Sequence, residues 1–311
     1  MIELVVLVGP TAAGKSALAV ALAERLGAEV VSADAFAVYR GLDIGTAKPG
    51  PAERRRVPHH LVDVADPRTR YSAGMFVRDA DAAIAAIRER GRQPIVVGGT
   101  MFYVRALLRG LFPEPPRDEA LRRTLEEDWR RDPATVRARL AAVDAEAAAR
   151  LAPGDRQRIL RALEVALAAG RPMSALWREH PLPPSRYPAR LLGTAPARPE
   201  LHARIAARVD EMYARGLPGE VRGLLAAGVP PGAHALKAIG YRECLRVLAG
   251  EWTVEQAREK TTTATRQLAK RQLTWLRGAG GVEWLQATGE AAVAEAVERL
   301  EAKRGSEPGS F

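Results

Sequence analysis

The residues best suited to chemistry at the start of the chain are GPTAAGKS at positions 9–16. They match the pattern G-x-x-x-x-G-K-[ST] of loops that bind phosphate, and they stand between an apolar run at 2–8 and a helical pattern at 15–26. In such a loop the glycines let consecutive N–H groups turn toward one anion, and the helix N-terminus adds partial positive charge. Lys15 supplies a cation, and the Ser16 hydroxyl can coordinate Mg²⁺. We therefore expect a phosphate-binding site, with Mg²⁺ at Ser16, formed by Gly9, Pro10, Thr11, Ala12, Ala13, Gly14, Lys15 and Ser16.

A carboxylate and a hydroxyl follow two of the other apolar runs. Asp34 comes just after the run at 28–31, and Thr100 follows the run at 94–97 through two glycines. Because parallel α/β sheets bind ligands beyond the carboxyl ends of their strands, both side chains could reach the phosphate site. Each has a simpler role open to it as well. Asp34 could cap the next helix, and Thr100 could be the N-cap of a helix at 100–109.

A second acidic residue at a strand end is what a nucleotide-hydrolysing P-loop enzyme normally uses to hold Mg²⁺. The run at 94–97 ends in GGT, with no carboxylate, and Asp34 is the nearest candidate. The pattern therefore gives no support to an ATP- or GTP-driven motor.

The order of the elements predicts the fold class. Strands are expected at 2–8, 28–31, 60–64, 94–97 and 190–194, and helices at 15–26, 72–90, 100–109, 198–215, 218–227, 239–249 and 253–277. Continuous apolar runs that alternate with helices are typical of parallel strands covered on both faces. We predict an α/β fold with a parallel sheet of the P-loop NTPase type and helices on both faces, with Ser72 capping the helix that it precedes.

Two proline-rich stretches interrupt this alternation. LFPEPPR at 111–117 and PLPPSRYP at 181–188 flank a stretch with helical patterns only, which predicts an all-helical insertion. We place the first part of the core at 1–112 and the insertion at 113–189. The completion of the core, with basic helices and a polar tail ending in RGSEPGSF, is placed at 190–311.

The composition is that of an ordinary globular protein with a basic surplus. The 47 lysines and arginines outnumber 37 acidic residues and give a net charge of +10. Such a surplus favours a polyanionic partner, although a compositional bias toward arginine also explains it. Cys244 is the single cysteine and excludes an internal disulfide. Without a signal-peptide pattern or a membrane-length apolar run, we expect a cytoplasmic protein with no membrane contact, and nothing demands more than a monomer.

Eight segments, in this order, resemble the tRNA dimethylallyltransferase family. They are GPTAAGKS (9–16), VVSADAFAVYRGLDIGTAKP (30–49), PHHLVDVADP (58–67), YSAGMFVRDA (71–80), VVGGTMFYVRALLRGL (96–111), QRILRALEV (157–165), LKAIGYRE (236–243) and ATRQLAKRQLTWLRG (264–278). Members look like nucleotide kinases in fold but use the P-loop for the diphosphate of a prenyl donor. The resemblance implies transfer of a dimethylallyl group from dimethylallyl diphosphate to N6 of the adenosine immediately 3′ of the anticodon in tRNA.

The resemblance also implies roles for single residues. Thr11 to Ser16 bind the diphosphate, and Asp34 is the carboxylate that accepts a proton from the adenine amine. Thr100 contacts the substrate, and Arg208 steadies the departing diphosphate. On sequence grounds alone Arg208 is typical of a solvated helix arginine.

The resemblance assigns further residues to tRNA contact. They are Asp34, Ala35, Phe36, Ala37, Thr100, Arg122, Gln157, Arg158, Ile159, Leu160, Arg161, Lys237, Ala238, Ile239, Gly240, Tyr241 and Arg242. Many members have Asp-Ser-x-Gln where this chain has residues 34–37, which bears on adenine recognition and not on the carboxylate. The family's tRNA partner is bound through its anticodon stem-loop, and we expect the helical insertion to act as a clamp on it.

A basic helix is expected near the C-terminus. Residues 258–277 contain six basic residues and one acid. At 100° per residue Arg266, Lys270 and Arg277 lie within about 40° of each other on one face, opposite Leu268 and Trp275. This pattern favours one packed face and one that meets phosphates, although a charged run is also typical of a solvated face.

Three other functions share parts of this pattern. A small-molecule or nucleotide kinase would use the same core and turn over ATP. An adenylate isopentenyltransferase would share the chemistry and act on free nucleotide. A nucleic-acid-binding protein could carry a vestigial P-loop, which the intact Lys15, Ser16 and Asp34 argue against.

Overall fold

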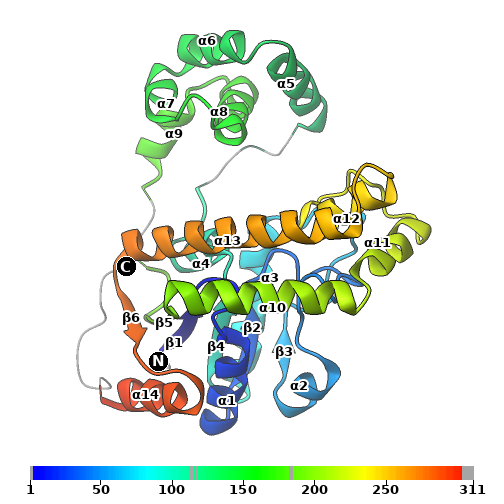
Figure 1. Cartoon of the computed structure of the whole chain (residues 1–311). Helices are drawn as coiled ribbons and strands as arrows, with labels where there is room; N and C mark the ends of the chain where they lie inside the picture. The colour runs from blue at the N-terminus through cyan, green and yellow to red at the C-terminus, as the bar shows by residue number, and fades with distance from the viewer. Residues whose placement is uncertain (1–2, 113–114, 116–117, 182–184, 303–311) are drawn as a thin grey trace. The chain divides into compact units, whose positions relative to one another are not determined.

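Six parallel strands form one sheet in the order β3-β2-β4-β1-β5-β6 (Figure 1). The computed structural model describes residues 3–112, 115, 118–181 and 185–302. The strands are β1 (Leu4–Val8), β2 (Glu29–Ser32), β3 (His59–His60), β4 (Pro94–Gly98), β5 (Ala189–Thr194) and β6 (Val282–Leu285). Every residue of β1 and β4 is buried, as central strands covered on both faces require. The predicted α/β fold with a parallel sheet is confirmed.

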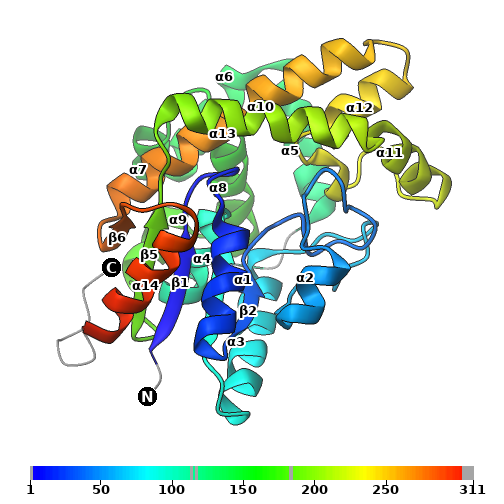
Figure 2. The same ribbon diagram turned by 60° about the horizontal axis from the view of Figure 1, so that its bottom comes forward.

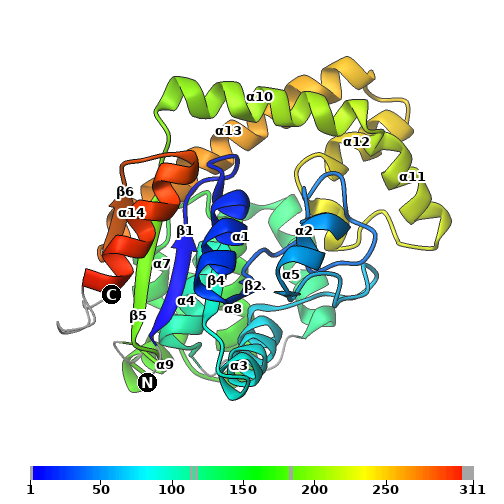
Figure 3. The same cartoon turned by 90° about the horizontal axis from the view of Figure 1, so that it is seen from below.

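Alternate residues of the strands face two different layers of helices. Val5 and Leu7 of β1 pack in one core with α1 (Lys15–Leu26) and α14 (Gly289–Ala302), which lie side by side in Figures 2 and 3. The other core contains Leu4, Val6 and Val8 with α3 (Ala73–Glu89) and α4 (Met101–Arg109). Since successive side chains of a strand point to opposite faces, β1, β2, β4, β5 and β6 each contribute to both cores.

Four helices lie between β5 and β6 in the chain, and the first and last of them pack beside the glycine-rich loop. They are α10 (Arg198–Ala214), α11 (Leu217–Ala226), α12 (Tyr241–Leu248) and α13 (Val254–Ala279). A short 3₁₀ turn at Ala235–Lys237 lies between α11 and α12. The six-residue α2 (Pro51–Arg56) comes earlier in the chain, before β3. The α10 and α13 helices run side by side (Figure 1). Leu201, Ile205 and Ala269 form their shared apolar contact, and Ala12 of the loop packs against it. The loop is therefore supported by both helices.

The chain divides into two compact units, Met1–Gly110 with Pro184–Phe311, and Leu111–Pro183. The sequence pattern places these boundaries at 112/113 and 189/190. The second unit consists of α5 (Glu119–Arg131), α6 (Pro133–Val143), α7 (Ala145–Arg150), α8 (Arg156–Ala169) and α9 (Met173–Glu179) around its own apolar core. Asp118, Asp132, Asp144 and Asp155 accept hydrogen bonds from backbone N–H groups at the starts of four of these helices. The described part of this unit is all-helical, as predicted.

Local differences from the sequence prediction have physical causes. The strand expected at 60–64 is wrong beyond His60, because Leu61 and Asp63 have φ of 60° and 59° and turn the chain. Ser72 accepts a hydrogen bond from the Met75 N–H and caps α3, as predicted.

The C-terminal part of the chain contains elements that differ from the sequence prediction. The sequence analysis assigned no element to β6 or α14, whose buried face is made of the small residues Ala292 and Ala296 and therefore gives a weak apolar signal. The predicted polar tail at 303–311 lies outside the described residues.

Within the residues that the structure describes, no helix combines the length and apolar character needed to span a bilayer.

Candidate active site

The glycine-rich loop connects β1 to α1 in a tight path past the end of β5. Gly9 has φ +154°, and a Cβ there would lie 2.5 Å from the Thr194 carbonyl oxygen. Gly14 has φ +84° and Ala12 has φ 62°, both in the left-handed region. The first-turn amides of α1, beginning at Lys15, have no partner within the helix. The loop therefore presents free N–H groups and the positive end of α1 at one place, which suits an anion.

Lys15 is folded back over the loop. Its Nζ donates a hydrogen bond to the Pro10 carbonyl oxygen at 2.6 Å. The pKa of Lys15 is lowered to about 7, mainly by burial and also by the Arg208 charge, while the Asp34 carboxylate opposes both effects. Because an added negative charge would favour the ammonium form, this lysine is suited to a ligand that brings negative charge.

A cavity of about 490 Å³ opens beside the loop. Among the residues assigned a role from the sequence, Lys15, Ser16, Asp34, Thr100 and Arg208 all line this one cavity, as do Thr11, Ala35, Phe36 and Ala37. The first five come from α1, the end of β2, the β4–α4 turn and α10. Its volume lies within the range of small-molecule sites. The fold thus gathers the predicted catalytic and diphosphate-binding residues at the carboxyl end of the sheet.

Asp34 is held by the turn that follows β2. Its Oδ1 accepts hydrogen bonds from the N–H groups of Phe36 at 2.8 Å and Ala37 at 3.0 Å. The residues that follow form turns and not a helix, so the alternative that Asp34 caps the next helix is wrong. Among the described residues Oδ2 has no hydrogen-bond partner. One carboxylate oxygen fixes the side chain, and the other remains able to accept a proton.

The Thr100 hydroxyl faces β2 and does not cap α4. Its Oγ1 accepts a hydrogen bond from the Ala35 N–H at 3.0 Å, and no side-chain cap forms at α4. The two strand ends approach closely because residue 98 is glycine, where a Cβ would lie 2.2 Å from the Ala33 carbonyl oxygen. The turn that carries Thr100 is thereby tied to the turn that carries Asp34.

Arg208 projects from α10 into the cavity. It is partly buried, and its Nη2 donates a hydrogen bond to the Thr46 carbonyl oxygen at 3.2 Å. Burial lowers the pKa of Arg208, and the Asp34 carboxylate opposes that shift. The alternative of a solvated helix arginine is therefore wrong.

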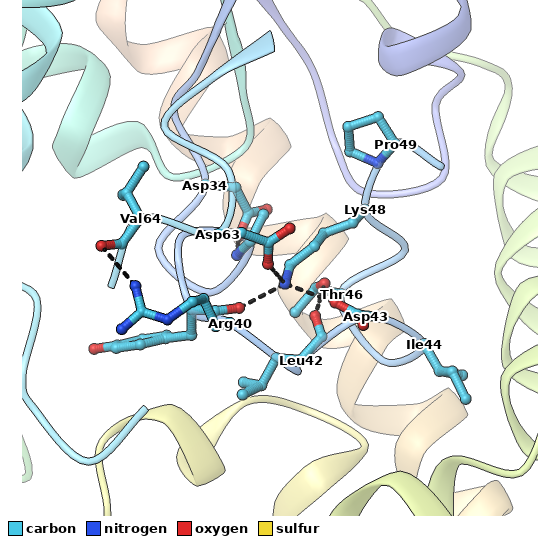
Figure 4. Close-up of polar contacts among 12 residues, drawn as sticks. Asp34, Arg40, Leu42, Asp43, Ile44, Thr46, Lys48, Pro49, Asp63 and Val64 are labelled. Atoms are coloured by element: carbon cyan, nitrogen blue, oxygen red, sulfur yellow. Dashed lines mark hydrogen bonds and ion pairs between the residues drawn. The ribbon is translucent and has the colours of Figure 1, made fainter. Parts of the chain in front are cut away.

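The loop that supports Arg208 is organised around a buried cation, Lys48 (Figure 4). Its side chain is 2% exposed, and its Nζ donates to the Tyr39 carbonyl oxygen at 2.5 Å and to Asp43 at 2.8 Å, and also to Asp63. Within the same loop, the Thr46 hydroxyl donates to the Leu42 carbonyl oxygen at 2.5 Å. The sequence analysis included Lys48 in a family-like segment but gave it no role.

Helix α13 supplies cavity residues that the sequence analysis missed. They are Arg271 and Gln272, together with Leu268 and Trp275, which were predicted only as a packing face. Gln272 Oε1 accepts a hydrogen bond from the Thr11 N–H at 2.8 Å, and its Nε2 donates to the Gly99 carbonyl oxygen at 2.8 Å. The spacing of Leu268, Gln272 and Trp275 on one helix face was the available signal.

The residues assigned to tRNA contact differ in exposure. The exposed ones are Gln157, Arg158, Lys237, Arg242, Arg266 and Lys270, the partly buried ones are Asp34, Ala35, Phe36, Thr100, Arg161 and Ile239, and the buried ones are Ala37, Arg122, Ile159, Leu160, Ala238, Gly240 and Tyr241. Arg122 forms ion pairs with Glu126 and Glu164 inside the helical unit. Tyr241 donates a hydrogen bond to Glu220 at 2.5 Å. Burial of these two side chains does not fit direct contact with RNA, whereas contact by the exposed set stays a prediction.

Comparison with known proteins identifies the family. The model of the family described as IPP transferase matches residues 37–279, and that of Isopentenyl transferase matches residues 2–63. The chain belongs to the IPP transferase family. The resemblance inferred from the eight sequence segments is thereby confirmed.

Individual relatives support this assignment over most of the chain. A tRNA dimethylallyltransferase of Geobacter metallireducens is 49% identical over 289 residues, which cover 93% of this chain and 94% of the relative. One from Anaeromyxobacter sp. (strain K) is 53% identical over 287 residues, covering 91% and 92%. The similarity therefore extends through the core and the helical unit.

Solved structures of the family show the same fold. The full-length tRNA isopentenylpyrophosphate transferase of Bacillus halodurans is 36% identical, with a TM-score of 0.73 and 97% of each chain covered. A eukaryotic dimethylallyltransferase acting on tRNA is 26% identical, with a TM-score of 0.82, and the match covers 99% of this chain and 82% of that one.

Proposed function

We propose that the protein transfers a dimethylallyl group from dimethylallyl diphosphate to N6 of the adenosine immediately 3′ of the anticodon in tRNA. The observation that carries the proposal is that a phosphate loop, Asp34, Thr100 and Arg208 line one cavity. The names of the relatives, tRNA dimethylallyltransferase, agree with it. A kinase reading explains the loop but leaves the basic helix and the helical unit without a role.

The donor site is the loop. Its free amides and Lys15 would hold the diphosphate, and each charge-assisted hydrogen bond contributes about 1.5–3 kcal/mol. Mg²⁺ prefers oxygen ligands. In proteins it usually keeps several bound water molecules and also binds phosphate oxygens of the substrate. The exposed Ser16 hydroxyl at the start of α1 fits such a role, and the described residues contain no cluster of three acidic, histidine or cysteine ligands that would bind a metal alone. When bound, the ion would neutralise negative charge on the diphosphate.

The acceptor side is Asp34. The exocyclic amine of adenine is a weak nucleophile because its lone pair is delocalised into the ring. As the new bond from N6 to the allylic carbon forms, Asp34 Oδ2 accepts the N6 proton. The Phe36 and Ala37 amides hold the carboxylate in place for this step. The target base must leave its stack first, which costs a few kcal/mol that phosphate contacts elsewhere on the tRNA would offset.

The leaving group departs toward positive charge. The bond from the allylic carbon to oxygen breaks, and its electron pair goes to the diphosphate. Arg208 lies ready in the cavity, held by the Thr46 carbonyl oxygen, so that it need not reorganise as negative charge develops. This arrangement stabilises the transition state more than the bound donor.

The setting of the reaction is part of the proposal. Because tRNA is the acceptor, we place the protein in the cytoplasm. We expect a monomer to be sufficient, since the cavity is lined by residues of one chain.

The test is incubation of the protein with labelled dimethylallyl diphosphate and Mg²⁺ in three arms. One arm contains tRNA, the second contains AMP, and the third contains tRNA with ATP and a readout of ATP consumption. We expect label in tRNA at the adenosine 3′ of the anticodon. Label in AMP alone would select an adenylate isopentenyltransferase. Consumption of ATP without prenyl transfer would select a kinase.

A further inference from the structure

We propose that Gln272 is a positioning residue that locks the diphosphate loop to the turn carrying Thr100. The inference deepens the proposed function and rests on it. Gln272 lies on α13, more than 170 residues along the chain from either of the backbone groups that it joins, Thr11 and Gly99.

The contacts of the Gln272 amide are complementary in polarity. Its Oε1 accepts from the Thr11 N–H and its Nε2 donates to the Gly99 carbonyl oxygen, both at 2.8 Å. A backbone N–H can only donate and a backbone carbonyl can only accept, so only one orientation of the amide satisfies both. Gln272 is 8% exposed, and both bonds are partly buried. A glutamine, and neither a glutamate nor a methionine, meets both requirements.

Residue 99 is shaped to receive this side chain. A Cβ at Gly99 would lie 2.5 Å from Gln272 Nε2. Gly99 does not require a left-handed backbone, because its φ lies outside that region. The glycine at 99 is therefore explained by the close approach of Gln272 and not by conformational freedom.

The bridge spans both halves of the proposed reaction. On one side Thr11 belongs to the loop that would hold the diphosphate. On the other side Gly99 precedes Thr100, whose hydroxyl holds the Ala35 N–H next to Asp34. A shift of Gln272 would therefore change the distance between donor and acceptor groups, on which the rate of transfer depends steeply.

The bridge also connects the site to the basic face of α13. Lys270 is exposed, and it lies about 160° around the helix from Gln272 at 100° per residue. Leu268 and Trp275 line the cavity on the same side as Gln272. A helix that meets tRNA phosphates on its outer face would thus hold the loop in place with its inner face.

The experiment compares Gln272→Met with Gln267→Met. Gln267 is exposed on the same helix, so its variant controls for the change in residue type. Methionine keeps the length of the side chain and removes both hydrogen bonds. We expect Gln272→Met to raise KM for dimethylallyl diphosphate, and the Kd for inorganic diphosphate, by about tenfold, with tRNA affinity within about twofold. Gln267→Met should match the wild-type protein. Equal values of KM for dimethylallyl diphosphate and of Kd for inorganic diphosphate in the two variants would overturn the inference.

A double-mutant cycle guards against a general loss of packing. Gly99→Ala should displace Gln272 and weaken diphosphate binding by a similar factor, and the Gly99→Ala, Gln272→Met pair should be no weaker than either single change. A double variant whose loss of diphosphate affinity equals the product of the two single losses would contradict a shared bridge.

A further measurement needs only the wild-type chain. The Thr11 amide should exchange with deuterium more slowly than the adjacent Ala12 amide, and equally rapid exchange would contradict the bond. If the wild-type protein binds diphosphate but transfers no prenyl group, the proposed function fails. If it transfers the group and the two methionine variants are alike, only the role of Gln272 fails.

Discussion

The Ala35 N–H donates a hydrogen bond to the Thr100 hydroxyl at 3.0 Å, which ties together the ends of two neighbouring strands, β2 and β4. Asp34 is one residue before this bond, and the turn it begins is closed by its own carboxylate. The position of the proposed base therefore depends on a hydroxyl that is 65 residues away in sequence.

Replacing Thr100 by valine should lower both stability and turnover. The variant keeps the shape of the side chain but leaves the Ala35 N–H without its acceptor, at a cost of about 1 kcal/mol in the free energy of unfolding. Misplacement of Asp34 should reduce kcat by about ten- to a hundredfold. Urea denaturation and steady-state kinetics measure the two effects. Thr100→Ser retains the hydroxyl and should recover most of both, so a serine variant as impaired as the valine variant would argue against this bond.

Diphosphate binding should take up a proton at Lys15 above neutral pH. The pKa of Lys15 in the free protein is about 7, so at pH 8 the neutral amine predominates. Bound diphosphate raises this pKa because the ammonium form pairs with the anion, and affinity should therefore fall as pH rises above 7. Calorimetry in buffers of different ionisation enthalpy should give uptake of about one proton at pH 8 and much less at pH 6.

The control is Lys15→Arg, whose guanidinium stays charged throughout this range. Its diphosphate binding should show no uptake of a proton by the side chain. The same pH-dependent uptake in this variant would assign the proton to another group.

Reversing the charge at Lys270 should weaken tRNA binding and its dependence on salt. Lys270 is exposed on α13, and loss of one phosphate contact reduces the slope of log K against log salt concentration by about one. Binding titrations of Lys270→Glu across a series of salt concentrations measure this slope. Arg25→Glu, at the far end of α1 from the loop, makes the same charge change at another exposed site and should leave the slope close to wild type. If both reversals change the slope equally, general charge and not this helix face governs binding.

The sequence predicted the parts of the site whose signal is local. The loop at 9–16 carries its function in adjacent residues, and Asp34 and Thr100 stand directly after strands, so the topology of a parallel sheet brings them together. Arg208 depended on the resemblance to a family, because one arginine in a charged helix has no distinctive pattern.

Gln272 and Lys48 could not be found in this way. Gln272 is uncharged, and both its partners are backbone groups that are 173 or more residues distant. Lys48 is a buried cation whose partners, Asp43 and Asp63, become its neighbours only when the loop closes. The resemblance also placed Arg122 among the tRNA contacts, whereas its ion pairs with Glu126 and Glu164 hold it inside the helical unit.

The most direct test of the central claim is single-turnover transfer by Asp34→Asn with labelled dimethylallyl diphosphate and saturating tRNA. Asparagine can still accept the hydrogen bonds of Phe36 and Ala37 through its Oδ1 but cannot take up the N6 proton. We predict that the Kd values for tRNA and donor stay within about twofold, while the rate of transfer falls by about 10²–10⁴. A rate near that of the wild-type protein would show that Asp34 is not the base and would contradict the account.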